Sequence, residues 1–442
     1  MKTACITLIA FVLFSCSGGN NGEYKIKAEN PEFLHRTMKA ITDRIVHDIF
    51  SPPVASRIYT YSSVAAYEAI INQDKNYVSL AGQLHGLDSI PQPDPTLEYC
   101  FPLASTQAII KVGRTLIFSE DEFDKFIEII YSEFKDTGIP DDVYDRSIAY
   151  GDAVAARILA WSSKDNYKQS RSFPKYSIES NPATWKPTPP AYMDAVEPHW
   201  NKIRTFVIDS AAQFKPAPST AFSIDKKSQF YKEATEVYET GKNLSEEQRA
   251  IASFWDCNPF AMNVRGHVMF ATKKISPGGH WINITRTVCA KSKSNMVQSA
   301  EAYVRVSLSL VEGFISCWDE KYRSRLIRPE SYINQYMDEN WVPLLQTPPF
   351  PEYTSGHSVI SSSASVALTK LFGDNYAFTD STETEFGMPA RSFKSFYQAA
   401  EEAGISRMYG GIHYRPAVEN GVKQGRAVGE FIASKIVTAP KK

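Results

Sequence analysis

Three short segments in the last third of the 442-residue chain carry the side chains best suited to chemistry. The first holds two cations seven residues apart, the second joins a serine, a glycine and a histidine, and the third holds an arginine and a histidine. These residues are Lys321, Arg328, Ser355, Gly356, His357, Arg407 and His413. Together they offer what a tetrahedral or trigonal-bipyramidal oxyanion requires: neutralising charge, hydrogen-bond donors, one nitrogen that can bond the central atom, and one acid–base group.

The Ser-Gly-His segment follows a proline-rich stretch over residues 348–354 and precedes a predicted helix that starts at Ser358. Because free backbone N–H groups and the helix dipole favour negative charge, such a helix N-terminus is suited to anion binding. Gly356 permits close approach to the backbone, Ser355 adds a hydroxyl donor, and His357 is placed to act as acid or base. By itself the segment is also compatible with a serine N-cap beside an incidental histidine.

The two flanking segments need a helix end or a turn to bring their side chains together. Lys321 and Arg328 lie nearly two helical turns apart and share one face if the helix continues that far, and Pro329 marks its end. Arg407 and His413 would lie on different faces of a continuous helix, so we expect the glycines between them to break it. Each segment alone is more typical of a solvated face or a structural turn.

The order Lys-x6-Arg-Pro, Ser-Gly-His and Ser-Arg-x5-His over residues 321–413 resembles the signature shared by vanadium-dependent haloperoxidases and type-2 acid phosphatases. The overall resemblance is greatest to the bacterial vanadium-dependent iodoperoxidases. It implies an enzyme with vanadate as its cofactor, hydrogen peroxide and halide as its substrates, and hypohalous acid as its product.

The same resemblance implies a role for each motif residue. The lysine and the two arginines would neutralise the equatorial oxygens of vanadate, and the serine hydroxyl and the glycine amide would hydrogen-bond them. His413 would bond vanadium directly, and His357 would be the acid–base group beside the apical oxygen.

The related phosphatases provide an alternative, a periplasmic acid phosphatase that hydrolyses phosphomonoesters. Phosphate would then occupy the pocket, with His413 as nucleophile and His357 as the acid that protonates the leaving alcohol. Ala417 stands where these phosphatases place an aspartate, although Glu419 or a residue elsewhere could replace it, and Thr354 replaces a proline usual in haloperoxidases. We rank haloperoxidase first because the Pro-Pro-Phe-Pro-x-Tyr lead-in to Ser-Gly-His looks more like haloperoxidases than phosphatases. The missing aspartate also weakens the phosphatase mechanism more than vanadate ligation, since a static ligand needs less activation than a nucleophile. A non-catalytic anion-binding lipoprotein is the third hypothesis.

Residues near the motifs correspond, by this resemblance, to the halide environment of the iodoperoxidases. They are Trp318, Asp319, Phe350 and Phe260. The aromatic residues are as readily explained as parts of the hydrophobic core, and Asp319 alternatively pairs with Arg323 one helical turn later. Since iodide requires the weakest oxidant, the resemblance favours iodide over bromide and bromide over chloride.

The elements that position these motifs are predicted to be helices. Apolar residues recur at helical spacing over residues 36–50, 56–73, 105–118, 121–134, 228–255, 294–325, 358–371 and 419–437. Strand-like alternation is scarce, so we predict an all-α fold of helical bundles with long loops. Residues 167–218 are expected to form a long ordered connection, because its aromatic side chains require burial. These are Trp185, Trp200, Phe206 and Phe214.

The N-terminus predicts export. An apolar run over residues 4–14 is too short for a membrane span and is typical of a signal peptide, and its Leu-Phe-Ser-Cys end resembles a bacterial lipobox. A lipidated Cys16 would make the chain a periplasmic or outer-membrane-anchored lipoprotein that contacts the membrane only through its lipid. A plain secretory signal is the alternative. The predicted organisation is a signal peptide over 1–16, a flexible tether over 17–30, an N-terminal helical region over 31–218 and a C-terminal helical bundle over 219–442.

Composition narrows the function classes further. The chain has 48 Lys and Arg against 49 Asp and Glu, and this balance argues against a nucleic-acid binder. No cysteine belongs to a C-x-x-C pair, so a structural zinc site is not expected and buried free thiols are favoured. The histidines outside the motifs are interpreted as structural, and the oligomeric state stays open.

Overall fold

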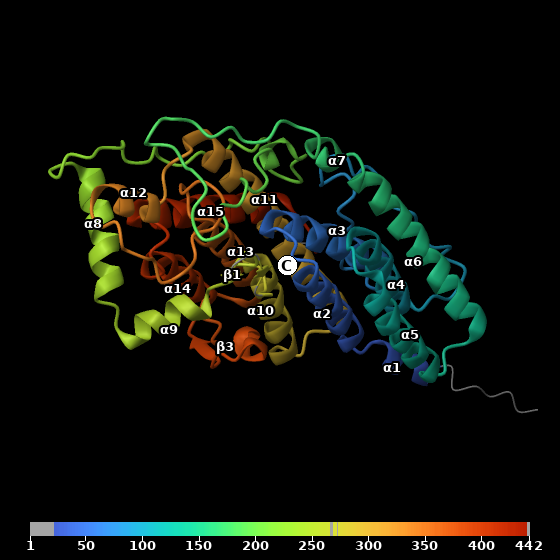
Figure 1. Cartoon of the computed structure of the whole chain (residues 1–442). Coiled ribbons are helices and arrows are strands. Elements are labelled where there is room, and N and C mark those ends of the chain that lie inside the picture. The colour runs from blue at the N-terminus through green and yellow to red at the C-terminus, as the bar shows by residue number, and fades with distance from the viewer. Residues whose placement is uncertain (1–21, 266–267, 272, 440–442) are drawn as a thin grey trace, which may run out of the picture.

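A computed structural model describes residues 22–265, 268–271 and 273–439, and these residues are mainly helical, which confirms the all-α prediction. The predicted signal peptide and Cys16 lie outside the described residues. Helices of the N-terminal half, drawn in blue to teal, gather on one side of the molecule, and helices of the C-terminal half, drawn in yellow to red, gather on the other (Figure 1). No helix in the described part of the chain combines the length and the apolar character that crossing a membrane demands.

Between residues 22 and 218, in the N-terminal half, the structure describes seven α-helices and two short 3₁₀ helices. They are α1 (Glu23–Ala28), α2 (Glu32–His47), α3 (Pro52–Ile70), η1 (Ile71–Gln73), α4 (Phe101–Leu116), α5 (Glu120–Asp136), α6 (Asp141–Ser162), α7 (Tyr167–Ser170) and η2 (Trp200–Lys202). α3 starts at the N-cap Ser51, whose side chain accepts a hydrogen bond from the Val54 amide, and prolines occupy its first turn. Every residue of α3 is buried, which makes it the central helix of this half.

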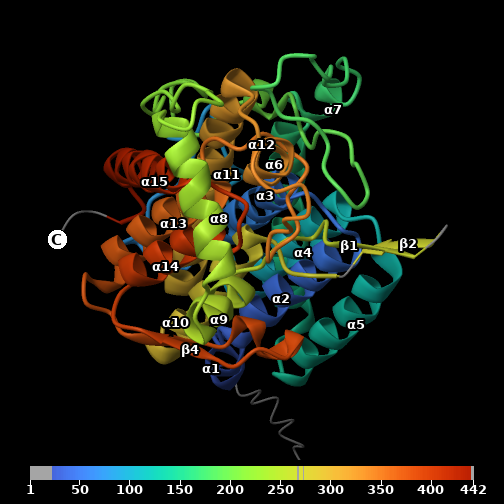
Figure 2. The ribbon, with the colours of Figure 1, turned by 60° about the vertical axis from the view of Figure 1, so that its left-hand side comes forward.

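The C-terminal half carries the motif residues and contains longer helices. Its elements are α8 (Gln229–Lys242), α9 (Glu246–Phe254), β1 (Met262–Arg265), β2 (Val268–Ala271), α10 (Pro277–Lys291), α11 (Met296–Ser324), α12 (Pro329–Tyr336), α13 (Gly356–Phe372), β3 (Phe378–Asp380), η3 (Thr382–Phe386), β4 (Arg391–Phe393), α14 (Phe396–Tyr409) and α15 (Arg415–Lys435). The strands form two antiparallel pairs, β1 with β2 and β3 with β4. The β1–β2 pair projects from the body of the molecule (Figure 2).

A continuous hydrophobic core joins the two halves. α11 packs against α3 on one side and α13 on another, and α13 also packs against α14 and α15. Where α3 meets α11, Thr60 donates a hydrogen bond to the Ser307 carbonyl at 3.0 Å, and the hydroxyls of Ser63 and Ser307 lie 3.0 Å apart. The predicted boundary between residues 218 and 219 falls in the extended segment before α8, and the core continues across it.

Several local predictions need correction. The expected flexible tether over 17–30 ends earlier, because residues 23–28 form α1 and its Tyr24 is buried and hydrogen-bonded to Glu98 at 2.6 Å. α11 ends at Ser324 with Arg325 in the left-handed conformation, so Pro329 begins α12 instead of ending the preceding helix. α6 and α10 were not predicted, and the range 228–255 divides into α8 and α9.

The connection over residues 167–218 is ordered and packed, as predicted. Trp185, Trp200 and Phe206 are buried, and Phe214 is partly buried against the core. The connection is held to α11 by Glu312, whose carboxylate accepts hydrogen bonds from the backbone N–H groups of Phe206, Val207 and Ile208. Burial raises the pKa of Glu312 to about 7.

Replacing Glu312 with alanine should therefore destabilise the protein strongly. The variant leaves three backbone N–H groups without their partner, and each unpaired buried donor costs about 1–3 kcal/mol. We expect Glu312→Ala to lower the free energy of unfolding by about 3 kcal/mol or more in chemical denaturation. The half-exposed Glu430, paired with Lys370 on the surface, is the control, since removing such a pair costs about 0–1 kcal/mol. Equal losses in the two variants would contradict this account.

Candidate functional site

The three motif segments meet where α13 begins. Lys321 lies in the last turn of α11, Arg328 caps α12, and Ser355 caps α13. α14 carries Arg407, and the turn between α14 and α15 carries His413. Gly410 ends α14 and Gly411 adopts a positive φ of 78°, so the predicted helix break is confirmed and the two side chains converge. Gly356, His357, Arg407 and His413 line one cavity of about 30 Å³.

His413 is held in one orientation by a carboxylate that the sequence motifs did not include. Its Nδ1 lies 2.9 Å from Glu352 Oε1, which also accepts the Tyr414 backbone N–H at 2.9 Å. Its Nε2 lies 3.1 Å from Arg328 Nη1, and since a guanidinium only donates, Nε2 carries a lone pair. The proton therefore resides on Nδ1. Burial and the nearby Arg328 hold the pKa of His413 well below its usual range, so the imidazole is neutral and its Nε2 lone pair, which accepts from Arg328 here, is suited to coordinating a metal.

Two arginines and the second histidine each keep one buried nitrogen without a hydrogen-bond partner in the described part of the chain. Arg328 donates to the carbonyls of Phe350 at 2.9 Å and Ile412 at 2.8 Å, and Arg407 donates to the Trp255 carbonyl at 2.9 Å. Arg328 Nη2, Arg407 Nε and His357 Nε2 are buried and have no hydrogen-bond partner among the described residues. The two arginine nitrogens are donors, and because unpaired buried donors are costly, this arrangement fits an oxyanion such as vanadate or phosphate.

Lys321 contributes charge and anchors a loop. Its ammonium group donates to the carbonyls of Pro351, Glu352 and Thr354, and these bonds use its three hydrogens. Complete burial, with repulsion from Arg328, lowers the pKa of Lys321 to about 7. The predicted role of Lys321 as a neutralising charge fits this position, whereas a direct hydrogen bond to an oxyanion would require it to release a carbonyl.

The start of α13 presents the remaining motif groups. The Ser355 hydroxyl accepts a hydrogen bond from the Ser358 backbone N–H at 3.3 Å and keeps its own hydrogen for donation to an anion. A Cβ added at Gly356 would lie 3.6 Å from the Trp318 ring, an ordinary van der Waals contact, so the glycine leaves its backbone N–H open to an anion beside that ring. His357 hydrogen-bonds to the Trp255 backbone, and burial, with Arg407 nearby, holds the pKa of His357 well below its usual range.

The residues predicted for the halide environment divide into two groups. Trp318, Phe350 and Phe260 line the cavity, and the rings of Trp318 and Phe350 lie 4.9 Å apart. Asp319 instead pairs with Arg323 at 3.2 Å and accepts a hydrogen bond from Asn201. Asp319 therefore makes the pair with Arg323, one helical turn later, that the sequence offered as its alternative role.

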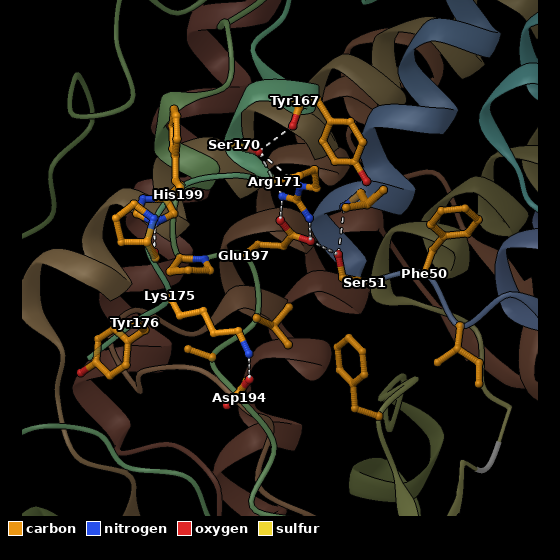
Figure 3. A pocket seen from close by; sticks show the side chains of 18 of the residues that line it. Phe50, Ser51, Tyr167, Ser170, Arg171, Lys175, Tyr176, Asp194, Glu197 and His199 are labelled. Carbon is orange, nitrogen blue, oxygen red and sulfur yellow. Dashed lines mark hydrogen bonds and ion pairs between the residues drawn. The ribbon is translucent and has the colours of Figure 1, made fainter. Parts of the chain in front are cut away.

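A wider cleft of about 470 Å³ adjoins the cavity, and Phe260 lines both. Figure 3 shows its polar side chains: Arg171 pairs with Glu197, which also accepts a hydrogen bond from Ser51 at 3.2 Å, and Lys175 pairs with Asp194 at 2.8 Å. Charged and aromatic side chains together line this cleft.

Comparisons with known proteins agree with this geometry. The family model of the VCPO second helical-bundle domain matches residues 301–440. The crystal structure of a bacterial vanadium-dependent iodoperoxidase is 51% identical, with a TM-score of 0.88, and the match covers 93% of this chain and 98% of that one. No curated protein sequence matches.

Holo- and apo-type structures of a bacterial vanadium-dependent chloroperoxidase share the fold at 15% identity. Their TM-scores are 0.68 and 0.66; the matches cover 88% and 87% of this chain, and 93% and 95% of theirs.

The geometry of His413 generates a direct prediction. Glu352→Gln removes the charge that orients the imidazole, and loss of such a supporting partner weakens ligand binding about 10–100-fold. We expect this loss in calorimetric titration with orthovanadate. Glu419→Gln is the matched control, because Glu419 is exposed on α15 and is the carboxylate that sequence spacing had suggested. Similar affinities for the two variants would show that Glu352 does not orient His413.

Proposed function

The chain belongs to the vanadium-dependent haloperoxidases, and from that premise we propose that it oxidises iodide with hydrogen peroxide. Iodide, hydrogen peroxide and one proton give hypoiodous acid and water, so that iodine is oxidised by two electrons and the peroxide oxygens are reduced. Near-complete coverage at 51% identity to an iodoperoxidase is the observation that supports iodide over the other halides.

The donor set fits vanadate. His413 would bond the metal through Nε2, and Arg328, Arg407, Ser355 and the Gly356 amide would surround its oxygens, with Lys321 adding charge. When bound, vanadate acts as a Lewis acid that activates peroxide without a change in its own oxidation state.

His357 is the residue we assign to proton transfer. Its Nε2 has no partner within the described residues, so the bond to the Trp255 carbonyl uses Nδ1–H and leaves a lone pair on Nε2. Since its pKa is lowered, the imidazole is neutral near pH 7 and can accept a proton from an incoming peroxide at Nε2. The Trp255 carbonyl, which also accepts from Arg407, keeps both side chains facing the cavity.

The cavity lining supports a weakly hydrated halide. Trp318, Phe350 and Phe260 give the cavity an aromatic wall. Among the halides considered, iodide loses the least hydration free energy on moving from water to such a wall.

The acid phosphatase alternative loses one of the arguments raised against it. Ala417 lacks the aspartate that phosphatases use, but Glu352 supplies an equivalent carboxylate to His413. The absence of an acid at position 417 therefore does not separate the two chemistries. The family assignment favours the haloperoxidase chemistry. Phosphate is expected to compete with vanadate for the pocket and so to act as an inhibitor.

Reconstitution tests the proposed activity. Protein stripped of anions should oxidise iodide only after vanadate is added, and excess phosphate should suppress the rate, as measured by triiodide absorbance. His413→Ala should fall to the background without vanadate, while His47→Ala, an exposed histidine at the end of α2, should keep full activity. Vanadate binding without iodide oxidation in the unmodified protein would refute the proposal.

We also propose that the protein is exported and lipidated at Cys16. The lipobox-like end of the apolar N-terminal run supports this location. Full-length protein should partition into detergent after expression in a bacterial host, and Cys16→Ala should stay in the aqueous phase. Equal partitioning of both forms would contradict lipidation.

A further inference from the structure

A second group of buried polar side chains lies beside the cavity and touches its wall through one residue. Cys257 follows α9, His280 occupies the first turn of α10, and Glu383 lies in η3. All three are at least nine-tenths buried, and none of them belongs to the oxyanion-binding set. Only Cys257 lines the cavity itself. Three separate segments thus direct a thiol, an imidazole and a carboxylate toward one point.

The three polar atoms form a compact triangle. Cys257 Sγ lies 3.3 Å from His280 Nδ1 and 3.8 Å from Glu383 Oε1, and these nitrogen and oxygen atoms lie 3.1 Å apart. Zinc bonds of about 2.3 Å to sulfur and 2.0–2.2 Å to nitrogen and oxygen, at tetrahedral angles, would separate the same pairs by roughly 3.6, 3.6 and 3.4 Å. The triangle therefore matches a tetrahedral zinc site to within about 0.3 Å.

The surroundings hold the imidazole in the orientation that a metal ligand needs. His280 Nε2 lies 2.6 Å from Asp380 Oδ2, a carboxylate that also accepts the Thr382 backbone N–H. A carboxylate on the far nitrogen is the usual support for a metal-bound histidine, since it leaves the other nitrogen as the ligand. Trp255 stacks on the ring at 4.5 Å with an angle of 21°, which restricts its rotation.

We infer that Cys257, His280 and Glu383 form a zinc site separate from the vanadate pocket, with water in the fourth position. A thiolate and an imidazole select zinc over magnesium or calcium, which prefer oxygen ligands. Binding displaces the thiol proton of Cys257 and one imidazole proton of His280 to solvent. Two protons leave and a divalent cation enters, so the net charge of the buried cluster is unchanged.

The site would brace the wall of the active cavity. Trp255 connects the two sites, because its ring stacks on His280 while its carbonyl accepts a hydrogen bond from Arg407. Zinc bound to Cys257 would fix the segment that follows Trp255. The zinc site thus acts as a positioning element for Arg407 and His357, and vanadate binding does not require zinc to touch the oxyanion.

Metal analysis of the vanadate-free protein tests this site without reference to activity. Protein produced with zinc and dialysed against metal-free buffer should retain about one zinc per chain by mass spectrometry. Cobalt substitution should produce d–d bands of a tetrahedral site together with a thiolate-to-cobalt charge-transfer band. Cys257→Ser should lose the charge-transfer band and the zinc.

Matched variants separate the site from adventitious binding. Cys289→Ser, a buried cysteine on the same helix as His280, should keep the metal, and so should Glu385→Gln, a more exposed neighbour of Glu383 in η3. Glu383→Gln should weaken zinc binding. Less than about 0.1 zinc per chain in the unmodified protein, or equal zinc in Cys257→Ser and Cys289→Ser, would overturn the inference. If the Cys257 variant fails to fold, the cobalt spectrum of the unmodified protein shows whether a thiolate ligates the metal, and absence of the charge-transfer band would overturn the inference. Vanadate uptake is measured separately, so that failure of the zinc site and failure of the proposed function can be distinguished.

Discussion

The rest of the site depends on an excess of buried positive charge. Lys321, Arg328 and Arg407 are almost fully buried. The buried Glu352 carboxylate attracts Lys321 and Arg328 electrostatically, but its hydrogen bonds go to His413 and the Tyr414 backbone. Burying unpaired ions costs several kcal/mol each, and the lowered pKa values of Lys321, Arg328 and Arg407 reflect that cost. A bound oxyanion offsets this cost, so vanadate is expected to stabilise the folded protein as well as to serve as its cofactor.

The scaffold holds these cations in place through main-chain contacts. Lys321 donates hydrogen bonds to carbonyls of the loop over residues 351–354. Arg328 donates to the Phe350 carbonyl, just before that loop, and to the Ile412 carbonyl, just before His413. The loop delivers Glu352 to His413 and Ser355 to the start of α13. α13 in turn packs against α11, α14 and α15, which carry or flank the other motif residues. Binding residues and structural residues are therefore largely the same residues, and mutations in the pocket are expected to affect stability as well as chemistry.

Local patterns predicted much of this arrangement. The helical spacing of apolar residues located α2, α3, α11 and α13, and the glycine pair before His413 indicated the turn that brings it back to Arg407. The motif residues could be identified because each belongs to a short sequence motif, and the three motifs follow one another in the expected order along the chain. Glu352 was missed because its partner His413 is 61 residues away, and only the folded loop shows that they meet. Pro329 was misjudged because proline suits a first helical turn as well as a helix end.

The Cys257 cluster shows the same limit more strongly. Its members are separated by 23 and 126 residues, far beyond the spacing of any local zinc motif, so cysteine patterns argued against zinc. Residues 23–28 were predicted as part of a tether because they follow the Ser-Gly-Gly-Asn-Asn-Gly run, although Tyr24 and Ala28 anchor them in the core. Contacts made across the fold, not local periodicity, determine these features.

Thermal unfolding with and without orthovanadate tests most directly whether buried positive charge organises the site. The account predicts that vanadate at about one hundred times its dissociation constant stabilises the anion-free protein by about 2.7 kcal/mol, and that Arg407→Gln largely loses this gain. An unchanged unfolding temperature on saturation with vanadate, or an equal gain in Arg407→Gln, would contradict it.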